Sequence, residues 1–182
     1  GDKIHWLICT TLNKNNSYFK KREIEISKVS KFFKFNSIHH LPFESTKVDK
    51  HSMSELIEKI SKVINKVKPN IIYLPFKEDV HSDHRKIFEA SYGCTKSFRY
   101  PFIKKIFMME TLSETEFVPS IKENGFIPNT FVDISKYMLK KIQIMKVYKS
   151  ELKKHPFPRS VKNIKALAIF RGSTSGCKFA ES

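Results

Sequence analysis

Residues 52–96 most constrain the fold, because an amphipathic helix runs there into a continuously apolar strand and then into a second helix. The first helix starts with a capping box, Ser52 followed three positions later by Glu55, and its apolar residues recur at helical spacing. The segment NIIYLPF, residues 70–76, is unbroken apolar sequence, typical of a strand buried on both faces of a parallel sheet. The polar turn DVHSDHR, residues 79–85, follows it directly.

The rest of the chain alternates strands and helices in the same way. We expect strands at 3–12, 38–43, 70–76, 102–111 and 130–135, and helices at 19–33, 52–68, 85–96, 134–148 and 160–170. A long loop over 112–129 separates the last strand and the last two helices from the others. This order predicts the α/β class with a mostly parallel sheet, in a single domain over residues 1–182.

The charge balance is strongly basic, with 34 lysines and arginines against 18 acids and a formal net charge of +16. Such an excess can indicate a nucleic-acid or membrane partner. Here the lysines are scattered along the chain, and neither a recognition helix nor a patch that interleaves aromatic and basic residues is present. The charge therefore argues for an anionic substrate group, or for a lysine-rich composition without function, and against a nucleic-acid binder.

Cysteine usage and hydropathy bear on location. Cys9, Cys94 and Cys177 form neither a CxxC pair nor a disulfide framework, so we expect free thiols in a reducing, cytoplasmic compartment. No apolar run approaches the ~18 residues that a transmembrane helix needs, and no signal peptide is present. The sequence starts with Gly and enters a strand almost at once, from which we expect a longer parent protein. Oligomerisation stays open.

The turn at residues 79–85 carries the candidate chemistry. In open α/β sheets, ligands bind outside the carboxyl ends of the strands, which is where this turn lies. His81 and His84 are three positions apart at a helix start, so their rings share a face, and imidazole is a common zinc ligand. Asp83 can accept a ring N–H. A catalytic zinc needs three protein ligands, so a third must come from elsewhere; the alternative is a polar, helix-capping turn without metal.

The segment YLPFKEDVHSDHRKIFEAS resembles the second signature of the PIG-L/LmbE family of zinc-dependent N-deacetylases, in which a strand runs into D-x-H-x-D-H-R and then a helix. Five further blocks resemble that family in the same order: KREIEISKVSKFF, IFMMET, FIPNTFVDIS, KVYKSE and ALAIFRGSTSGCKFAE. Together they cover the chain from Lys3 to Glu181. The resemblance implies a Rossmann-like three-layer α/β/α fold.

The resemblance also implies a function and a set of site residues. The family removes the acetyl group from an N-acetylglucosamine-type sugar or glycolipid, with zinc as cofactor. His84 matches the family's metal ligand, and His81 matches the histidine that polarises the substrate or protonates the departing amine, with Asp83 in support. Arg22 and Asp79 match positions near the substrate.

One departure from the family is large. The family's N-terminal H-P-D-D-E motif supplies two zinc ligands and the general base, and this sequence contains no such motif. Its first strand matches the family's second. The chain is then either an N-terminally incomplete deacetylase, inactive by itself, or a degenerate sugar-binding module that has lost the metal site. Zinc content separates the two hypotheses.

Overall fold

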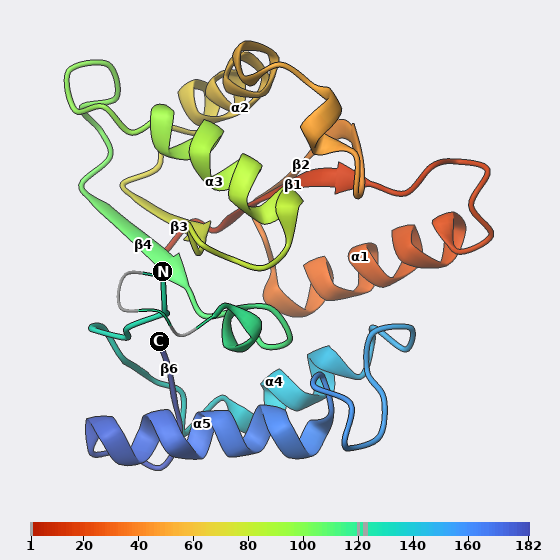
Figure 1. The fold of residues 1–182 in the computed structure, drawn as a ribbon, viewed down its shortest axis with the longest axis vertical. Helices are drawn as coiled ribbons and strands as arrows, with labels where there is room; N and C mark the ends of the chain where they lie inside the picture. The colour runs from red at the N-terminus through yellow and green to blue at the C-terminus, as the bar shows by residue number, and fades with distance from the viewer. Residues whose placement is uncertain (1, 120, 122–123) are drawn as a thin grey trace.

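A computed structural model describes residues 2–119, 121 and 124–182. The elements in chain order (Figure 1) are β1 (His5–Thr11), α1 (Phe19–Phe33), β2 (Ser37–Glu44), η1 (Val48–Lys50), α2 (Met53–Val67), β3 (Ile71–Pro75), α3 (Ser82–Gly93), β4 (Lys105–Met109), η2 (Thr115–Phe117), β5 (Val132–Asp133), α4 (Met138–Met145), α5 (Val161–Ser175) and β6 (Ala180–Glu181). The expected strands and helices are all present, with shifted ends. β6 and the two short 3-10 helices were not anticipated.

Local capping chemistry sets the helix ends. The backbone N–H of Glu55 donates to the Ser52 hydroxyl at 3.2 Å, which confirms Ser52 as the N-cap of α2, while the Glu55 carboxylate lies 2.9 Å from Nδ1 of His51. Ser160 caps α5 in the same way, accepting from the N–H of Asn163 at 3.2 Å. α5 runs past its expected end at residue 170, and Gly176 follows it with a φ of +76°, the left-handed conformation that glycine adopts most easily.

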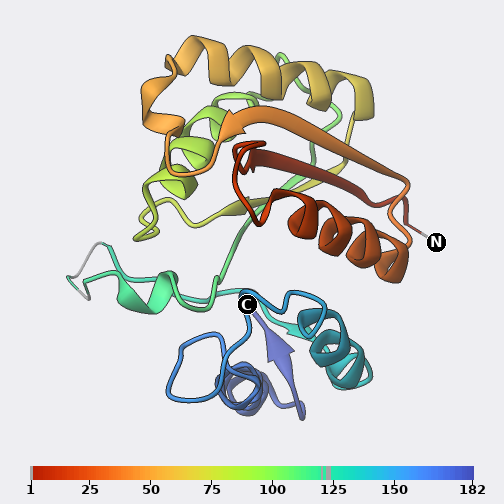
Figure 2. The same cartoon turned by 90° about the vertical axis from the view of Figure 1, so that its right-hand side faces the viewer.

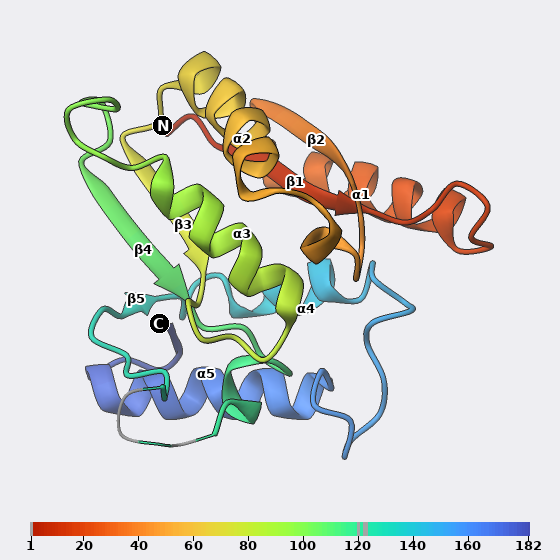
Figure 3. The same cartoon turned by 45° about the horizontal axis from the view of Figure 1, so that its top comes forward.

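The four main strands form two separate parallel pairs, β1 with β2 and β3 with β4, and β5 pairs antiparallel with β6. The parallel α/β class is confirmed, but the expected single sheet is divided. Within the described residues no strand ladder joins β1 to β3. Figure 3 shows the order β2, β1, β3, β4 across the molecule, so β1 and β3 are the two inner strands.

Helices cover the strands from both sides, with α1 on one face and α2 and α3 on the other (Figure 2). One core lies between the strands and the layer of α2 and α3. Its buried members include Phe43, Leu56 and Ile60, which are fully excluded from solvent. Leu7 from β1 and Ile72 from β3 pack against the same core. The two parallel pairs are therefore held side by side by a common helix layer.

The expectation that residues 70–76 are buried on both faces is wrong. Leu74 is buried, but Tyr73, whose side chain points to the opposite face, is 57% exposed. Tyr73 stacks on Phe107 of β4, with ring centroids 5.4 Å apart. α3 covers one face of β3, and none of the described helices buries the other. An apolar sequence shows only that a strand is able to be buried on both faces. Whether it is buried depends on the elements packed against it, and Tyr73 remains more than half exposed.

The C-terminal region has a smaller core of its own, formed by α4 and α5 with Ile134, Met138 and Ile164 among its buried residues. The long loop before it contains the 3-10 turn η2, and residues 120 and 122–123 of that loop lie outside the described residues. No helix in the described part of the chain is both long and apolar enough to cross a bilayer.

Candidate active site

The turn between β3 and α3 is organised around Asp79, which is completely buried. Its Oδ1 accepts the backbone N–H of His81 at 2.8 Å, and its Oδ2 lies 2.9 Å from Nδ1 of His84. The guanidinium of Arg85 donates to the backbone carbonyls of Asp79 and Val80 at 2.6 and 2.8 Å. Both carboxylate oxygens are thus used inside the protein. The assignment of Asp79 to the substrate stays a prediction.

The partner of His84 fixes which of its ring nitrogens is available. An ionised carboxylate can only accept, so the Nδ1 of His84 carries the proton that bonds to Asp79. In the neutral ring, Nε2 is then unprotonated and keeps its lone pair. A carboxylate that holds a histidine in this way is the arrangement found behind metal-ligating imidazoles. His84 is therefore prepared to act as a ligand or a base through Nε2.

His81 has the opposite arrangement. Its Nδ1 accepts the backbone N–H of Asp83 at 3.2 Å and so caps α3. In the neutral ring the proton must then be on Nε2, which makes His81 a donor at that atom. The rings of His81 and His84 stack, with centroids 4.8 Å apart and planes 22° from parallel. The turn thus presents one donor nitrogen and one acceptor nitrogen side by side.

The electrostatics of the turn also act on His84. Burial lowers the pKa of its imidazole, but the hydrogen bond and negative charge of Asp79, with smaller contributions from Glu114 and Asp83, outweigh burial and raise that pKa above its ordinary value. These three acids thus favour the imidazolium form. A bound cation would favour the neutral form, so protons and cations compete for this ring.

Asp83 does not orient a ring, contrary to the hypothesis that it accepts a ring N–H. It is 4% exposed, and its carboxylate accepts the backbone N–H groups of Thr46 at 2.6 Å and Val48 at 3.3 Å. These residues follow β2, so Asp83 joins the carboxyl-end loop of β2 to the start of α3. It positions the helix that carries His84, and any support it gives to His81 passes through the backbone.

Arg22 lies in a separate cluster on α1. Its guanidinium pairs with Glu151, lies 5.5 Å from the ring centroid of Tyr148, and approaches Glu25 at 3.8 Å. Tyr148 and Glu151 belong to the KVYKSE block. The structure therefore brings together two of the family-like blocks, but Arg22 is not hydrogen-bonded to the turn at residues 79–85. Its assignment to the substrate stays a prediction.

Zinc requires more donors than the described residues bring together. Within those residues no group of three or more histidine, cysteine, aspartate or glutamate side chains could hold a metal ion. His84 offers one suitable nitrogen, and Asp79 and Asp83 are committed to other bonds. A catalytic zinc needs three protein ligands. The residues in this part of the chain therefore do not fit a complete zinc site.

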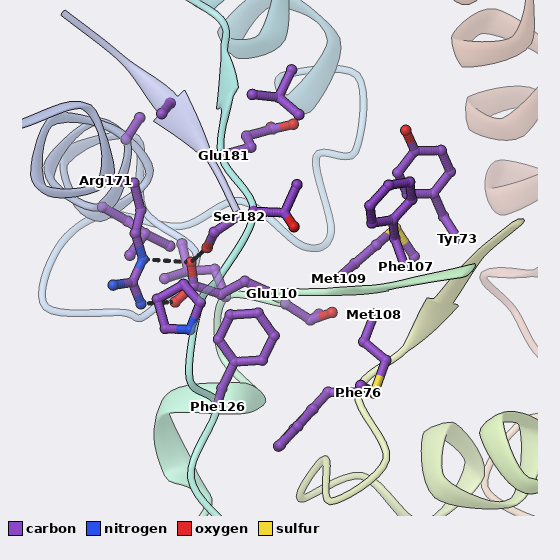
Figure 4. A pocket seen from close by; sticks show the side chains of 18 of the residues that line it. Tyr73, Phe76, Phe107, Met108, Met109, Glu110, Phe126, Arg171, Glu181 and Ser182 are labelled. Carbon is purple, nitrogen blue, oxygen red and sulfur yellow. Dashed lines mark hydrogen bonds and ion pairs between the residues drawn. The ribbon is translucent and has the colours of Figure 1, made fainter. Parts of the chain in front are cut away.

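A cavity of about 720 Å³ opens on the other face of β3 and β4 (Figure 4). Tyr73, Phe76 and Phe107 line it, and Phe126 packs edge-on against Phe76, with ring centroids 5.2 Å apart. Asp79, His81 and His84 are not among the residues that line it. The cavity is thus mainly apolar, with some charged residues at its wall, and its lining does not include the histidine turn.

An ion pair closes one side of this cavity. The Arg171 Nε donates to Glu110 Oε2 at 2.9 Å, and the Ser182 hydroxyl donates to the same oxygen at 2.7 Å (Figure 4). Arg171 thus pairs with Glu110, whereas Glu181 pairs with Lys141. The hydrogen bond to Glu110 raises the pKa of Arg171. The ion pair attaches α5 to the end of β4.

The family model PIG-L, described as GlcNAc-PI de-N-acetylase, matches residues 1–94, which include both β1 and the histidine turn. The chain belongs to the PIG-L family. The match ends at Cys94, the residue that follows α3. The matched part of this PIG-L chain therefore contains Asp79, His81 and His84.

Solved structures share the fold of this PIG-L chain. The N,N'-diacetylchitobiose deacetylase from Pyrococcus horikoshii has a TM-score of 0.73 at 16% identity, over 99% of this chain and 71% of that one. A zinc-inhibited form of teicoplanin deacetylase has a TM-score of 0.67 at 14% identity, over 91% and 73%. The 4-carboxy-2-hydroxymuconate hydratase from Pseudomonas putida KT2440 has a TM-score of 0.69 at 13% identity, over 99% and 82%. The fold therefore supports more than one chemistry.

Proposed function

We propose that this chain is the histidine-bearing part of an N-deacetylase that hydrolyses the acetamide of an N-acetylglucosamine-type sugar or glycolipid. The observation that carries the proposal is the stacked His81–His84 pair, with a donor and an acceptor nitrogen held at the carboxyl end of β3 by a buried aspartate. PIG-L family membership supports the reaction class. Zinc is the metal we propose, with His84 as its ligand from this chain.

His81 provides the proton in this proposal. Hydrolysis of an acetamide creates negative charge on the carbonyl oxygen and then expels an amine, which must gain a proton. The Nε2–H of His81 is the donor that the turn offers, since its Nδ1 is occupied by the N–H of Asp83. General acid catalysis of this kind typically contributes ~10²–10⁴-fold. Asp79 and Asp83 serve as positioning residues through the ring and the backbone.

We infer the carrier of the sugar from the net charge of the chain and from its family. The net charge of +16 favours an anionic carrier, such as the phosphate of a glycolipid headgroup, over a neutral free sugar. Arg22, if released from Glu151, is the residue of α1 that we assign to that carrier. We propose a cytoplasmic enzyme, consistent with the three free cysteines.

A second candidate is a sugar-binding module without catalysis. It is favoured by the finding that the described residues do not supply three metal donors.

The two candidates differ in zinc content and in amine release from N-acetylglucosamine phospholipid, measured on the longest polypeptide that the gene encodes. We expect His84→Ala to lose zinc and amine release, and His81→Ala to keep zinc and lose rate by about 10²-fold or more. Normal zinc and turnover in both variants contradict the proposal, and absence of zinc from the wild type favours the binding module.

A further inference from the structure

The outward side of α1 carries positive charge without acids. Figure 2 shows the helix lying on β1 and β2 from the side opposite α2 and α3. Glu25 is one of its buried residues, and Glu23 is partly buried. The exposed residues of the helix are Lys20, Lys21, Ile24, Ser27, Lys28, Lys31, Phe32 and Phe33. Within α1, all of which the structure describes, the exposed side thus has four lysines and no acid.

Two apolar side chains lie among these lysines. Neighbouring positions on a helix surface are three or four residues apart. Ile24, which is 55% exposed, therefore lies between lysines on both sides, and Phe32, which is 46% exposed, lies one turn beyond Lys28. A lysine can lay its stem along such a residue and extend its amine into a polar layer. We call the following set the α1 face: Lys20, Lys21, Ile24, Lys28, Lys31 and Phe32.

The lysines of other helices have acidic partners. On α2, Lys62 pairs with Glu58 at 2.6 Å, and on α3, Lys86 pairs with Glu89 at 3.4 Å. The ion pairs that α1 makes are those of Arg22. Among the described residues, no carboxylate pairs with a lysine of the α1 face. Its positive charge is therefore available to an anionic partner.

The first turn of α1 lies at the edge of the sheet that holds the histidine turn. The carbonyl of Thr11, the last residue of β1, accepts the N–H of Ser45 at 2.9 Å. The next residue, Thr46, donates its N–H to Asp83 at 2.6 Å. The loop after β1, which leads into α1, therefore starts beside the segment that contacts the histidine turn.

An exposed tyrosine stands at this end of α1. Tyr18 directly precedes the helix and is 56% exposed, and the ammonium group of Lys21 lies 5.6 Å from its ring centroid. A tyrosine has an apolar ring and a polar hydroxyl, which suits the boundary between lipid and water. Tyr18 thus extends the α1 face toward the site.

We propose that the α1 face docks on the surface of a lipid bilayer that contains anionic lipids, with Ile24 and Phe32 entering the headgroup layer and the four lysines contacting lipid phosphates. Helices that bind at bilayer surfaces combine lysines and apolar side chains in this way. Docking brings the headgroup of a glycolipid to the edge of the sheet where His81 and His84 lie. This delivery of substrate rests on the proposed function, whereas docking itself does not.

Two other arrangements are less well supported. A nucleic acid also attracts lysines, but its phosphates are contacted in water, where Ile24 gains little, whereas a bilayer takes up that side chain. α5 exposes Ile169 and Phe170 near Lys162 and Lys165. It carries two lysines where the α1 face carries four, so its attraction to an anionic surface is smaller.

The experiment measures sedimentation of this chain with vesicles at about 0.15 M salt, where charges more than about 8 Å from a surface are screened. Vesicles of phosphatidylcholine with about 30% phosphatidylserine are compared with pure phosphatidylcholine. Each lysine near an anionic surface contributes roughly fivefold to affinity, so we expect the anionic vesicles to bind at least about 100-fold more tightly. A four-lysine variant should lose at least about 100-fold of that affinity. It combines Lys20→Gln, Lys21→Gln, Lys28→Gln and Lys31→Gln.

A control variant with the same loss of charge separates the α1 face from net charge. It combines exposed positions of α2 and α5, namely Lys62→Gln, Lys66→Gln, Lys162→Gln and Lys165→Gln. It should bind within about threefold of the wild type. If it loses as much affinity as the four-lysine variant, binding depends on net charge or on α5, and the proposal is wrong. Absence of binding by the wild type, or equal binding to neutral and anionic vesicles, also contradicts it.

Entry of the apolar side chains is tested by fluorescence. The chain has one tryptophan, so Ile24→Trp in a Trp6→Phe background gives a single probe on the α1 face. Its emission should shift to the blue on anionic vesicles, and brominated lipids should quench it. Ile169→Trp in the same background, at a position 52% exposed on α5, should show neither effect. If the probe at position 24 stays in water, or if double-stranded RNA binds as tightly as the vesicles, the α1 face binds polyanions and does not dock on membranes.

Failure of docking and failure of the proposed function are distinguishable, because these vesicles contain no N-acetylglucosamine lipid. If the longest polypeptide binds vesicles but releases no amine, docking stands and the proposed function fails. If it does release amine, the substrate is offered both as glycolipid in vesicles and as a soluble N-acetylglucosamine phosphate. The four-lysine variant should lower the ratio of the two rates at least about tenfold. An unchanged ratio would overturn the delivery of substrate by the α1 face.

Discussion

Nδ1 of His84 lies 2.9 Å from Oδ2 of Asp79, which is fully buried, so the ring is held by a carboxylate that has no contact with solvent. The acid that orients the metal-ligand candidate is thus five residues before it. Sequence reasoning gave the ring-orienting role to Asp83, which is closer in sequence and holds backbone N–H groups instead. The pair sets the chemistry of the turn, because it decides which nitrogen of His84 is free.

The first prediction concerns the ring protons of the two histidines. We expect nitrogen NMR at a pH above both ring pKa values to show the Nδ1–H form for His84 and the Nε2–H form for His81. In Asp79→Asn, an amide can turn either its oxygen or its nitrogen to the ring, so the preference of His84 should weaken. His40, which is exposed, serves as the control ring. Identical proton positions in His81 and His84 would contradict the donor and acceptor assignment.

The second prediction concerns Asp83 as a positioning residue. Asp83→Ala leaves the part-buried N–H of Thr46 and the buried N–H of Val48 without their acceptor, which should cost about 1–3 kcal/mol of unfolding free energy. Urea denaturation followed by circular dichroism measures this loss. Asp49→Ala, at an exposed position, should change little. If Asp83→Ala is as stable as the wild type, Asp83 is not needed to hold the loop after β2 against α3, and its role as a positioning residue is wrong.

The third prediction concerns the ion pair between β4 and α5. The side chains of Glu110 and Arg171 are only 11% and 14% exposed, so Glu110→Gln leaves a mostly buried arginine without its counter-charge. We expect a loss of about 2–3 kcal/mol, somewhat below the cost of breaking a fully buried pair. Lys62→Ala removes the exposed pair with Glu58 and should leave stability unchanged within error. Equal effects of the two changes would show that the ion pair contributes no more than a surface contact.

The fourth prediction concerns a glycine inside α5. A Cβ at Gly172 would lie 2.7 Å from the carbonyl oxygen of Cys177 and 2.9 Å from the backbone of Lys178, both of which are backbone atoms that cannot rotate away. Gly172→Ala should therefore lower the melting temperature, although alanine favours helices. Among the described residues, a Cβ at Gly125 would meet nothing within 4 Å, so Gly125→Ala is the control. A stabilised Gly172→Ala variant would mean that the backbone at 177–178 is free to move aside.

The fifth prediction concerns stability at alkaline pH. Burial raises the pKa of the Cys9 thiol from 9.0 to about 12, so the folded state keeps a proton that the unfolded state loses. The contribution is fully present below pH 9 and is lost as the pH rises from 9 toward 12. Cys9→Ala should reduce the slope of unfolding free energy against pH in this window, relative to the wild type. An unchanged slope would show that the thiol is not protected by burial.

Local patterns in the sequence predicted much of the fold. The expected helix at 19–33 coincides with α1, and Ser52 and Ser160 cap α2 and α5 as their positions indicate. These features depend on neighbours within about four residues, where periodicity and capping chemistry are decisive. The histidine turn was found for the same reason, because its residues are contiguous and follow a strand.

Contacts between distant residues could not be predicted in this way. The partner of Arg171 proved to be Glu110 rather than Glu181, and Asp83 bonds to Thr46 and Val48, more than thirty residues earlier. Each choice depends on which chain segments meet in space, and several acids are compatible with one arginine. With 34 basic and 18 acidic residues in the chain, the sequence does not show which acid each basic residue pairs with.

The sequence by itself determined the strands, the helices and the order of the chemical groups along the chain, because these follow from short-range periodicity and backbone hydrogen bonding. Only the tertiary structure decided that the parallel strands of the described residues form two separate pairs, and that Tyr73 on one side of β3 is more than half exposed. The pairing and burial of a strand depend on the segments that lie next to it in the fold. The residues of the strand itself show only that it is able to pair and to be buried.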